Sequence, residues 1–334
     1  MLGPGALLHG LSARLRGAVL VAALILLASP AARAVDDEAE AAEVDRFLAK
    51  YYPAPVEGPP LRPPGMASRL WVDGSYAATD DLTALPYVAG TGQNLRFAAG
   101  GTLRWRRFAF TGELPFTQVT TLDVTAIPGG APIPEDAHQT AVSLGDLRLG
   151  VDWTQHLTPW LLGGFGLRGR FPTHTTRFQF HLIDGSLASY AFPYYFHVDP
   201  AAILGGKLGR FTFVLNQGAV ILLGPDGNFG DQHIVVPTIV FWDAAYAVSY
   251  SPVDALAASF QVATDIQLNH VDGIEFQKLN DVRSVWIAPA LQFHLADYRV
   301  DAIARWGVTR GADLFGVIQY AGSSSYTLRV SRNF

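Results

Sequence analysis

The stretch SSYTLRVSRNF, residues 324–334, decides the fold. Tyr326, Leu328 and Val330 alternate with polar residues, and the aromatic residue Phe334 follows them. An apolar residue at every second position predicts a strand with one apolar and one polar face. Because the same alternation recurs along most of the chain, the sequence as a whole predicts an all-β protein.

The first 34 residues have the layout of a targeting segment. Arg14 and Arg16 precede the apolar run AVLVAALILLA at 18–28, and the motif ARA at 32–34 is a small-x-small cleavage site. This layout predicts a secretory signal peptide over 1–34 that is cleaved at its end. The apolar run is shorter than the ~20 residues that a membrane-spanning helix needs. We therefore expect export and not a helical anchor.

Composition narrows the class of protein. The chain has 334 residues, a net charge of −5 and no cysteine, which excludes a disulfide framework and thiol chemistry. No basic patch indicates a nucleic-acid partner. Hydrophobic residues make up 49% of the sequence, yet after the signal peptide no apolar run is long enough for a spanning helix. An exported, apolar chain of this kind is typical of a transmembrane β-barrel.

Residues 35–67 differ from the rest of the chain. The segment 35–52 predicts a helix, because acidic residues crowd its first turns and Val44 and Leu48 share one face. The Pro-rich segment 53–64 predicts an extended linker. We expect this region in the periplasm, either as a tail or as a helix that caps or plugs the mouth of the barrel.

Residues 68–334 predict an outer-membrane barrel of about twelve antiparallel strands, with ten or fourteen as alternatives. The strands are expected at 69–79, 94–106, 108–116, 138–155, 160–173, 194–208, 211–222, 233–250, 255–268, 282–295, 299–309 and 323–334. Five connections are tight turns, near 106, 156–159, 209–210, 251–254 and 296–297, and the other six are longer. This pattern is typical of periplasmic turns and extracellular loops. An even strand number places both ends of the barrel in the periplasm.

Aromatic residues support this orientation. Several lie within a few residues of the short turns or of the last strand's end: Trp105, Phe108, Trp153, Trp160, Tyr250, Phe293, Tyr298 and Phe334. Aromatic side chains gather where lipid headgroups meet hydrocarbon. They therefore predict a periplasmic girdle in contact with outer-membrane lipids.

Charged residues fall on the polar faces of the predicted strands. A charge that faces lipid at mid-depth costs ~2–4 kcal/mol, so these side chains are expected to face the lumen. At Gly145-Asp146 the alternation changes phase, which predicts a β-bulge. Two interpretations of the lumen stay open: charges of both signs pair and hold the barrel open, or three arginines form a basic ladder that guides an anionic headgroup. The lumen candidates are Arg96, Glu113, Asp146, Arg148, Asp152, Arg168 and Arg170, of which Arg148, Arg168 and Arg170 would form the ladder.

The segment 174–196 is dense in aromatic residues, including Phe178, Phe180, Tyr190 and Phe192. It is interpreted either as an extracellular girdle or as a capture site for an apolar solute. The histidines of this region lack metal-ligand spacing, so we expect neither a metal nor a cofactor. No Ser–His pair on neighbouring strands indicates a hydrolase. The chain is therefore expected not to be an enzyme, with an outer-membrane lipid hydrolase as a remote alternative.

Two motifs resemble a known family. The segments LGDLRLGVD at 144–152 and GGFGLRGRFPT at 163–173 resemble outer-membrane transporters associated with phenol degradation, which are similar to long-chain fatty-acid channels. The matching residues are Gly145-Asp146-Leu147 and Pro172-Thr173, and His174 stands where the family usually has glycine. The resemblance implies passive uptake of small hydrophobic or amphipathic organic molecules and no catalytic residues. A structural or surface-interaction barrel that transports nothing stays open as the alternative.

The last strand also resembles the C-terminal strand of bacterial outer-membrane barrels. This resemblance implies an assembly signal at Tyr326, Leu328, Val330 and Phe334 and recognition by the barrel-assembly machinery. The expected location is therefore the bacterial outer membrane.

Overall fold

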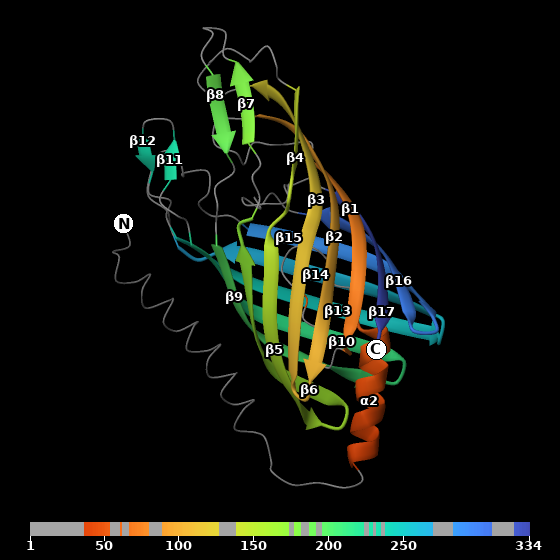
Figure 1. Cartoon of the computed structure of the whole chain (residues 1–334). Helices are drawn as coiled ribbons and strands as arrows, with labels where there is room; N and C mark the ends of the chain where they lie inside the picture. Colours follow the sequence, from red (N-terminus) through yellow and green to blue (C-terminus); the bar gives the residue numbers. More distant parts are fainter. Residues whose placement is uncertain are drawn as a thin grey trace, which may run out of the picture.

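The computed structural model describes residues 37–53, 61, 67–79, 89–126, 138–173, 177–181, 187–191, 196–223, 227–229, 232–234, 238–269, 283–308 and 324–334. These residues form a closed antiparallel β-barrel of 12 strands with a helix at one end (Figure 1). The predicted all-β barrel of twelve strands is confirmed.

The elements follow the chain in simple order. They are α2 (Asp37–Tyr51), β1 (Arg69–Thr79), β2 (Ala89–Trp105), β3 (Phe108–Ala126), β4 (His138–Ser143), β5 (Leu147–Thr158), β6 (Leu161–Phe171), β7 (Arg177–His181), β8 (Leu187–Ala191), β9 (Phe196–Leu208), β10 (Phe211–Leu223), β11 (Gly227–Phe229), β12 (Gln232–Ile234), β13 (Ile239–Val253), β14 (Leu256–Gln267), β15 (Arg283–Leu295), β16 (Tyr298–Gly307) and β17 (Ser324–Asn333). The pairs β7–β8 and β11–β12 are hairpins outside the barrel sheet. Because β4 and β5 both pair with β3, they share one position in the barrel.

The first and last strands close the barrel. β17 pairs with β16 on one side and with β1 on the other, where Asp73 lies opposite Arg329. The amide of Phe334 donates a hydrogen bond to the carbonyl oxygen of Ser68 at 2.9 Å. The two ends of the barrel therefore lie side by side.

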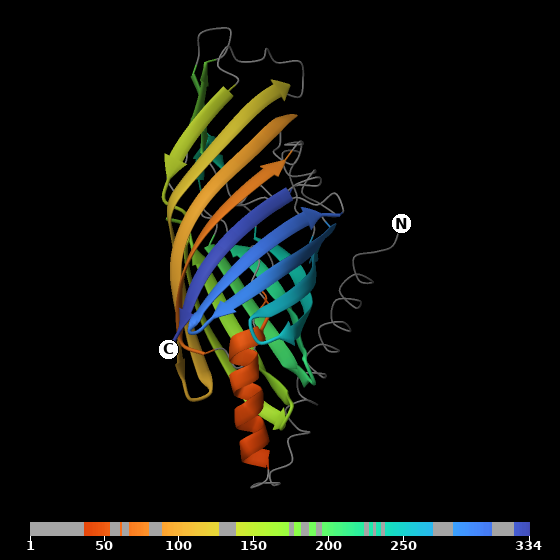
Figure 2. The same ribbon diagram turned by 90° about the vertical axis from the view of Figure 1, so that its right-hand side faces the viewer.

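Five two-residue turns join strands at the end of the barrel where α2 lies, at 106–107, 159–160, 209–210, 254–255 and 296–297 (Figures 1 and 2). The second and fourth turns come later than predicted, because β5 and β13 continue to Thr158 and Val253. The first residue of three turns has a left-handed backbone, and Gly209, with φ of 58°, adopts it without a steric penalty.

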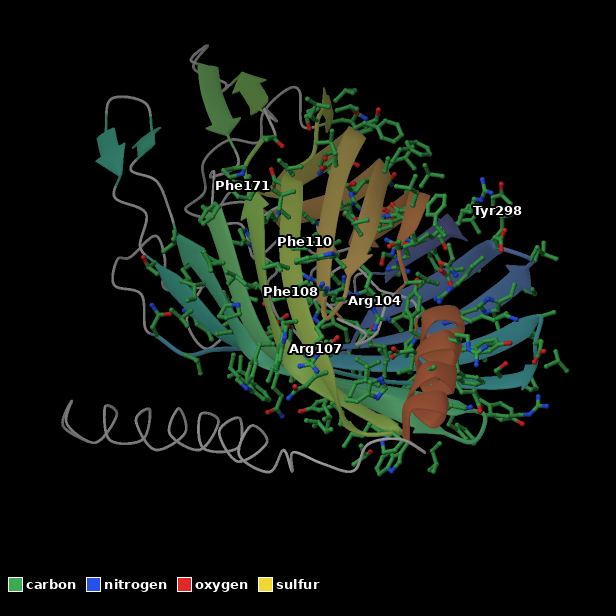
Figure 3. All side chains as sticks on the ribbon, turned by 60° about the horizontal axis from the view of Figure 1, so that its bottom comes forward. Arg104, Arg107, Phe108, Phe110, Phe171 and Tyr298 are labelled. Atoms are coloured by element: carbon green, nitrogen blue, oxygen red, sulfur yellow. The ribbon has the colours of Figure 1, made fainter. Side chains whose placement is uncertain are left out.

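The two faces of the barrel differ in polarity. On the outer face, Leu103 and Leu328 are 64% and 56% exposed, whereas their inward neighbours Thr102 and Arg329 are only 4% and 5% exposed. Figure 3 shows side chains on both faces, with Phe108, Phe110 and Tyr298 among those labelled. The girdle residues predicted near the short turns are exposed, except Trp153, which is half-buried. An apolar outer face and a polar inner face suit a barrel surrounded by lipid.

The change of phase in the alternation of inward and outward side chains involves two neighbouring strands. Pairing between β2 and β3 shifts by one residue at Phe97/Ala98, so the extra residue lies in β3. The neighbouring strand is interrupted at 144–146, where the Gly145 amide donates to the Pro115 carbonyl oxygen at 2.9 Å. Ser143 and Asp146 are both buried, so the inward phase changes between them. The predicted bulge exists, but it is shared between β3 and the β4–β5 strand.

β2 and β3 are unusually long. They have 17 and 19 residues, compared with 10 in β16 and 10 in β17. Together with β4 they extend away from the end that carries the short turns (Figure 2). This three-stranded extension continues one side of the barrel beyond its neighbours.

The helix α2 is the only helix in the described ranges, and it packs against the inner wall of the barrel. Its residues Val44 and Leu48 are buried in a cluster with Leu162 of β6. No helix within the described ranges is long and apolar enough to cross a membrane. The apolar face predicted for 35–52 therefore faces the inside of the barrel mouth.

Candidate functional site

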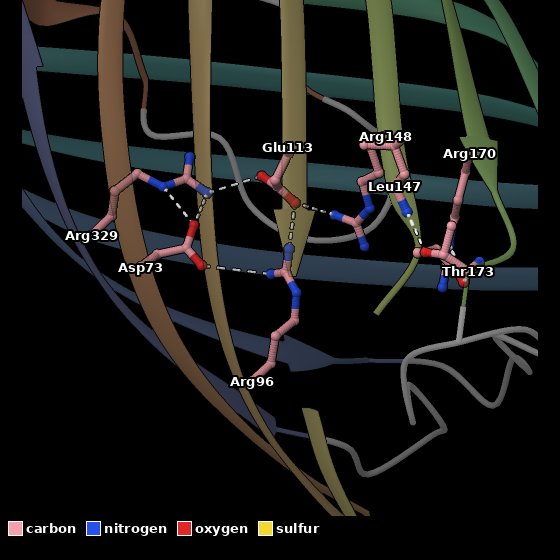
Figure 4. A network of polar contacts seen from close by, with 9 residues as sticks. Asp73, Arg96, Glu113, Leu147, Arg148, Arg170, Thr173 and Arg329 are labelled. Atoms are coloured by element: carbon pink, nitrogen blue, oxygen red, sulfur yellow. Dashed lines mark hydrogen bonds and ion pairs between the residues drawn. The ribbon is translucent and has the colours of Figure 1, made fainter. Parts of the chain in front are cut away.

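A network of ion pairs runs along one wall of the lumen (Figure 4). Arg329 Nη2 on β17 lies 2.6 Å from Asp73 Oδ2 on β1. Arg96 Nη1 on β2 lies 3.6 Å from Asp73 Oδ1, and its other amino group contacts Glu113 on β3. Arg148 Nη1 on β5 lies 3.0 Å from Glu113 Oε1. Five neighbouring strands are thereby connected through alternating positive and negative charges.

Two further pairs extend this wall across β5 and β6. Arg168 Nη2 lies 3.2 Å from Asp152 Oδ2, and Arg170 Nε lies 2.7 Å from Asp146 Oδ2. The structure thus brings all seven lumen candidates into ion pairs. Since each of Arg148, Arg168 and Arg170 has a carboxylate partner, charge pairing describes this wall, and an uncompensated basic ladder does not.

Three charged residues near this wall are not among the lumen residues predicted from the sequence. Arg69, Asp73 and Arg299 are 3%, 5% and 1% exposed. The alternation along 69–79 places Arg69 and Asp73 on the inner face, together with Trp71. The signal was therefore present in the strand pattern, although it does not reveal the partners.

The opposite wall of the lumen carries an apolar cluster among buried polar side chains such as Asn216, Asp243 and Gln261. Leu61 is 1% exposed and is buried in a cluster with residues of β10, β13, β14 and β15, namely Val214, Ala245, Ala247, Ala263 and Trp286. Trp286 lies in the half of β15 away from the turn at 296–297. A residue of the Pro-rich segment 53–64 therefore lies inside the barrel, deeper than α2.

Polar contacts hold α2 in the mouth of the barrel. Asp45 Oδ2 accepts a hydrogen bond from Arg104 Nη2 at 3.1 Å, and Asp45 Oδ1 accepts one from His156 Nε2 at 3.0 Å. Lys207 Nζ donates to Glu43 Oε1 at 2.6 Å. Figure 3 looks toward this end of the barrel, with α2 in front of the strands and Arg104 labelled. The helix thus bridges β2, β5 and β9.

The environment of Asp45 favours its charged form. Partial burial by itself raises the pKa of Asp45, but the hydrogen bond from His156 and the charge of Arg104 outweigh this effect and lower the pKa below its ordinary value. The pKa of Glu43 is also lowered, by its hydrogen bond and charge interaction with Lys207. Both contacts of α2 therefore depend on ionised carboxylates.

Tyr52 follows α2 directly and is enclosed by arginines. Its side chain is 1% exposed, and its ring centroid lies 4.0 Å from the Arg299 guanidinium carbon and 4.5 Å from that of Arg69. Its carbonyl oxygen accepts a hydrogen bond from Gln292 Nε2 at 3.2 Å. The chain after α2 therefore continues into the lumen.

Three of the predicted mouth residues belong to a hairpin outside the barrel sheet, whereas the predicted assembly residues lie in β17 and at Phe334. β7 and β8 form a hairpin in which Phe178 is opposite Tyr190 and Phe180 is opposite Ala188. Phe192 lies outside the described residues. The assembly candidates face outward: Tyr326, Leu328, Val330 and Phe334 are all exposed. Within the described ranges, no cluster of His, Asp and Glu has the arrangement of a metal site.

Comparison with known proteins identifies solved structures with a similar fold. No protein-family model matches the chain, and no curated protein matches its sequence. The translocator domain of the autotransporter NalP from Neisseria meningitidis aligns with a TM-score of 0.52 at 11% identity, over 80% of this chain and 89% of that chain. The NanC porin aligns with a TM-score of 0.46 at 11% identity, over 79% and 100% of the two chains. The CymD monoaromatic hydrocarbon channel aligns with a TM-score of 0.45 at 8% identity, over 80% and 88%.

At these identities the likeness establishes the fold alone. The chain has the fold of outer-membrane β-barrels.

Proposed function

We propose that this protein is an outer-membrane channel for passive passage of small hydrophobic or amphipathic organic molecules. The observation that supports the proposal is the two-sided lumen. Ion pairs line the wall formed by β17, β1, β2, β3, β5 and β6, and the opposite wall carries a local apolar cluster from β10, β13, β14 and β15. A solute with a polar and an apolar end would find a matching surface on each side. The outer mouth would carry Phe178, Phe180, Tyr190 and Phe192, which would meet the solute first.

In this proposal α2 is a plug at the periplasmic end, and it has to withdraw before a solute passes. Its two carboxylate contacts are partly exposed, with Glu43 64% and Asp45 29% exposed at the side chain. Ion pairs at such exposed positions contribute little to stability, because water screens them. These two ion pairs therefore hold the helix only weakly, and its docking depends mainly on the buried side chains Val44, Leu48 and Tyr51.

The experiment that tests this proposal compares a protein in which α2 is cross-linked to the barrel with one from which α2 is deleted. The sequence has no cysteine, so E43C/K207C can be joined by a bismaleimide without side reactions. The protein is reconstituted into liposomes, and entry of benzenesulfonate, an amphipathic anion that does not cross the lipid by itself, is measured for the cross-linked variant, the uncross-linked variant and a variant lacking 35–67. We expect no entry through the cross-linked protein and the fastest entry through the deletion variant. E43C capped with N-ethylmaleimide is the control for the chemistry.

A barrel that transports nothing is the second candidate, and the buried ion-pair network favours it. Asp73, Arg96 and Arg329 are each at most 5% exposed, as expected for charges that fill a lumen. In that case the variant lacking 35–67 would pass no more solute than protein-free liposomes. That result would overturn the channel proposal.

A further inference from the structure

We infer that the lumen contains a binding site for a small aromatic carboxylate, and that Tyr52 of the same chain occupies it in this structure. The inference rests on the proposed channel function and adds the position of the site and the chemistry of its ligand. The site consists of Arg69 on β1, Gln292 and His294 on β15, and Arg299 and Asp301 on β16.

The first observation is the arrangement of cations around one ring. The guanidinium carbons of Arg299 and Arg69 lie 4.0 and 4.5 Å from the centroid of Tyr52. Cations within about 6 Å of a ring centroid are attracted to its electron-rich face, and more strongly where water is excluded. Arg69, Arg299 and Tyr52 are all at most 3% exposed. The wall is thus built to hold an aromatic ring.

The second observation is that Tyr52 does not satisfy the polar groups that surround it. Its own hydroxyl is buried without a hydrogen-bond partner in the described part of the chain. The same holds for one polar atom on each of four inward side chains: Gln292 Oε1, His294 Nε2, Arg299 Nη2 and Asp301 Oδ2. These side chains are at most 7% exposed. Buried polar atoms without partners are costly, so this set is better suited to another occupant.

The unsatisfied atoms lie close together. His294 is opposite Arg299, and Gln292 is opposite Asp301, in the register of β15 and β16. All four residues face inward, so their unsatisfied atoms form one patch. In this patch Arg299 Nη2 is a donor, Gln292 Oε1 and Asp301 Oδ2 are acceptors, and His294 Nε2 is either, depending on its tautomer. Arg299 already donates through Nε to Asp301 at 2.7 Å and through Nη1 to the Lys50 carbonyl oxygen at 3.4 Å. Nη2 is therefore the group that remains for a ligand.

These features define the ligand. An aromatic ring would take the place of the Tyr52 ring between the two guanidinium groups. A carboxylate on that ring would accept a charge-assisted hydrogen bond from Arg299, which is stronger than a neutral one. A ring hydroxyl, where present, would donate to Gln292 or Asp301. Tyr52 offers the ring without the carboxylate, so a free aromatic carboxylate would compete with it.

Binding at this site would also act on the plug. Tyr52 is the residue after Tyr51, whose hydroxyl donates to the Asp254 carbonyl oxygen at 3.1 Å and whose own carbonyl oxygen accepts from Thr212 Oγ1 at 3.0 Å. A ligand that displaces Tyr52 would pull on these last contacts of α2. The ligand would therefore favour the open mouth.

The test measures binding to the full chain in detergent micelles, with 4-fluorobenzoate as the probe and its fluorine NMR signal as the readout. We expect Tyr52→Ala to bind the probe at least tenfold more tightly than the wild type, because the competitor is gone. Arg299→Gln and Arg299→Lys should each bind it at least tenfold more weakly. Arg332→Gln is the matched control, since Arg332 is exposed on the outer face and should leave binding unchanged.

Two further probes define the chemistry of the site. Cyclohexanecarboxylate has the charge without the ring, fluorobenzene has the ring without the charge, and both should bind far more weakly than 4-fluorobenzoate. Equal binding of 4-fluorobenzoate by the wild type, Tyr52→Ala and Arg299→Lys would overturn the inference.

If a variant does not refold, the E43C/K207C cross-link supplies the test, because fixing α2 should weaken binding in an otherwise native lumen. Binding without liposome entry would refute the channel and keep the site, and entry without binding would do the reverse.

Discussion

The amide of Thr173 donates a hydrogen bond to Asp146 Oδ1 at 3.1 Å and joins two segments that are 27 residues apart in the sequence. Arg170 Nε binds the other carboxylate oxygen at 2.7 Å. The Thr173 hydroxyl donates to the Gly145 carbonyl oxygen at 2.5 Å and accepts from the Leu147 amide at 3.1 Å (Figure 4). The segments 144–152 and 163–173 are therefore one hydrogen-bonded unit, located at the phase change of the barrel wall.

We predict that Asp146→Ala lowers the free energy of unfolding by ~1–3 kcal/mol, because it removes the partner of the half-buried Arg170 and leaves the Thr173 amide without its acceptor. Asp146 is 4% exposed, so water cannot fully replace the carboxylate. Urea titration of protein refolded in lipid vesicles measures the change. The control is Asp123→Ala, which removes an exposed pair with His138 and should cost ~0–1 kcal/mol. Equal losses in the two variants would contradict the buried role of Asp146.

Glu113 is predicted to set the ion selectivity of the open lumen. It contacts both Arg96 and Arg148, so Glu113→Gln removes one negative charge and leaves both cations in place. In a variant lacking 35–67, the reversal potential in a salt gradient should shift toward anions. Asp297→Asn, in the turn between β15 and β16, should leave the potential unchanged. An unchanged reversal potential would show that Glu113 does not line the conducting path.

Acid is predicted to release α2 through Asp45, which faces Arg104 on β2 and His156 on β5. The pKa of Asp45 is below its ordinary value when the helix is docked. A carboxyl group with a lowered pKa stabilises the docked state above pH ~4, and this stabilisation is lost as pH falls through the docked-state value. Channel openings should therefore become more frequent below pH ~4. Asp45→Asn should open more often near neutral pH and show a smaller acid step, because only Glu43 still titrates. An acid step of unchanged size in this variant would contradict the prediction.

Gly164 is predicted to be irreplaceable in β6. A Cβ atom at this position would lie 1.9 Å from the carbonyl oxygen of Trp153 on β5, so the two backbones would have to separate. Gly164→Ala should destabilise the barrel by ~1–3 kcal/mol. Gly112→Ala is the matched change, because its Cβ would meet only Leu149 Cδ2 at 3.6 Å. Similar unfolding midpoints for the two variants would contradict this close approach.

Deletion of Phe334 is predicted to impair assembly more than stability. Its side chain is 70% exposed, and its amide makes one hydrogen bond to Ser68. Insertion into the outer membrane of cells should fall, whereas the melting temperature of protein refolded in detergent should change little. Insertion equal to that of the full chain would refute an assembly signal at this residue.

The strand alternation was sufficient to predict the barrel, because lipid and water impose opposite demands on its two faces. It also indicated that Arg96 and Glu113 face inward. It did not reveal that they touch, since their contact depends on the register between β2 and β3 and on the extra residue near Phe116. The alternation of apolar and polar residues in the strands gives no information about which segments fill the lumen. Tyr52 and Leu61 lie in a region for which the sequence predicts the end of a helix and a linker. The residues that they contact belong to distant strands and are brought to them only when the barrel folds.

The seam between β1 and β17 has a consequence for folding kinetics. Its ion pair joins Asp73 and Arg329, which are 256 residues apart. Folding rates fall as the sequence separation of contacts rises, because the entropy of loop closure is lost before the contact forms. Every hairpin of the wall can form locally, but this one seam requires nearly the whole chain to be present. Closure of the seam is therefore expected to be the slow step, during which both edge strands remain open to pairing with a helper protein or with another chain.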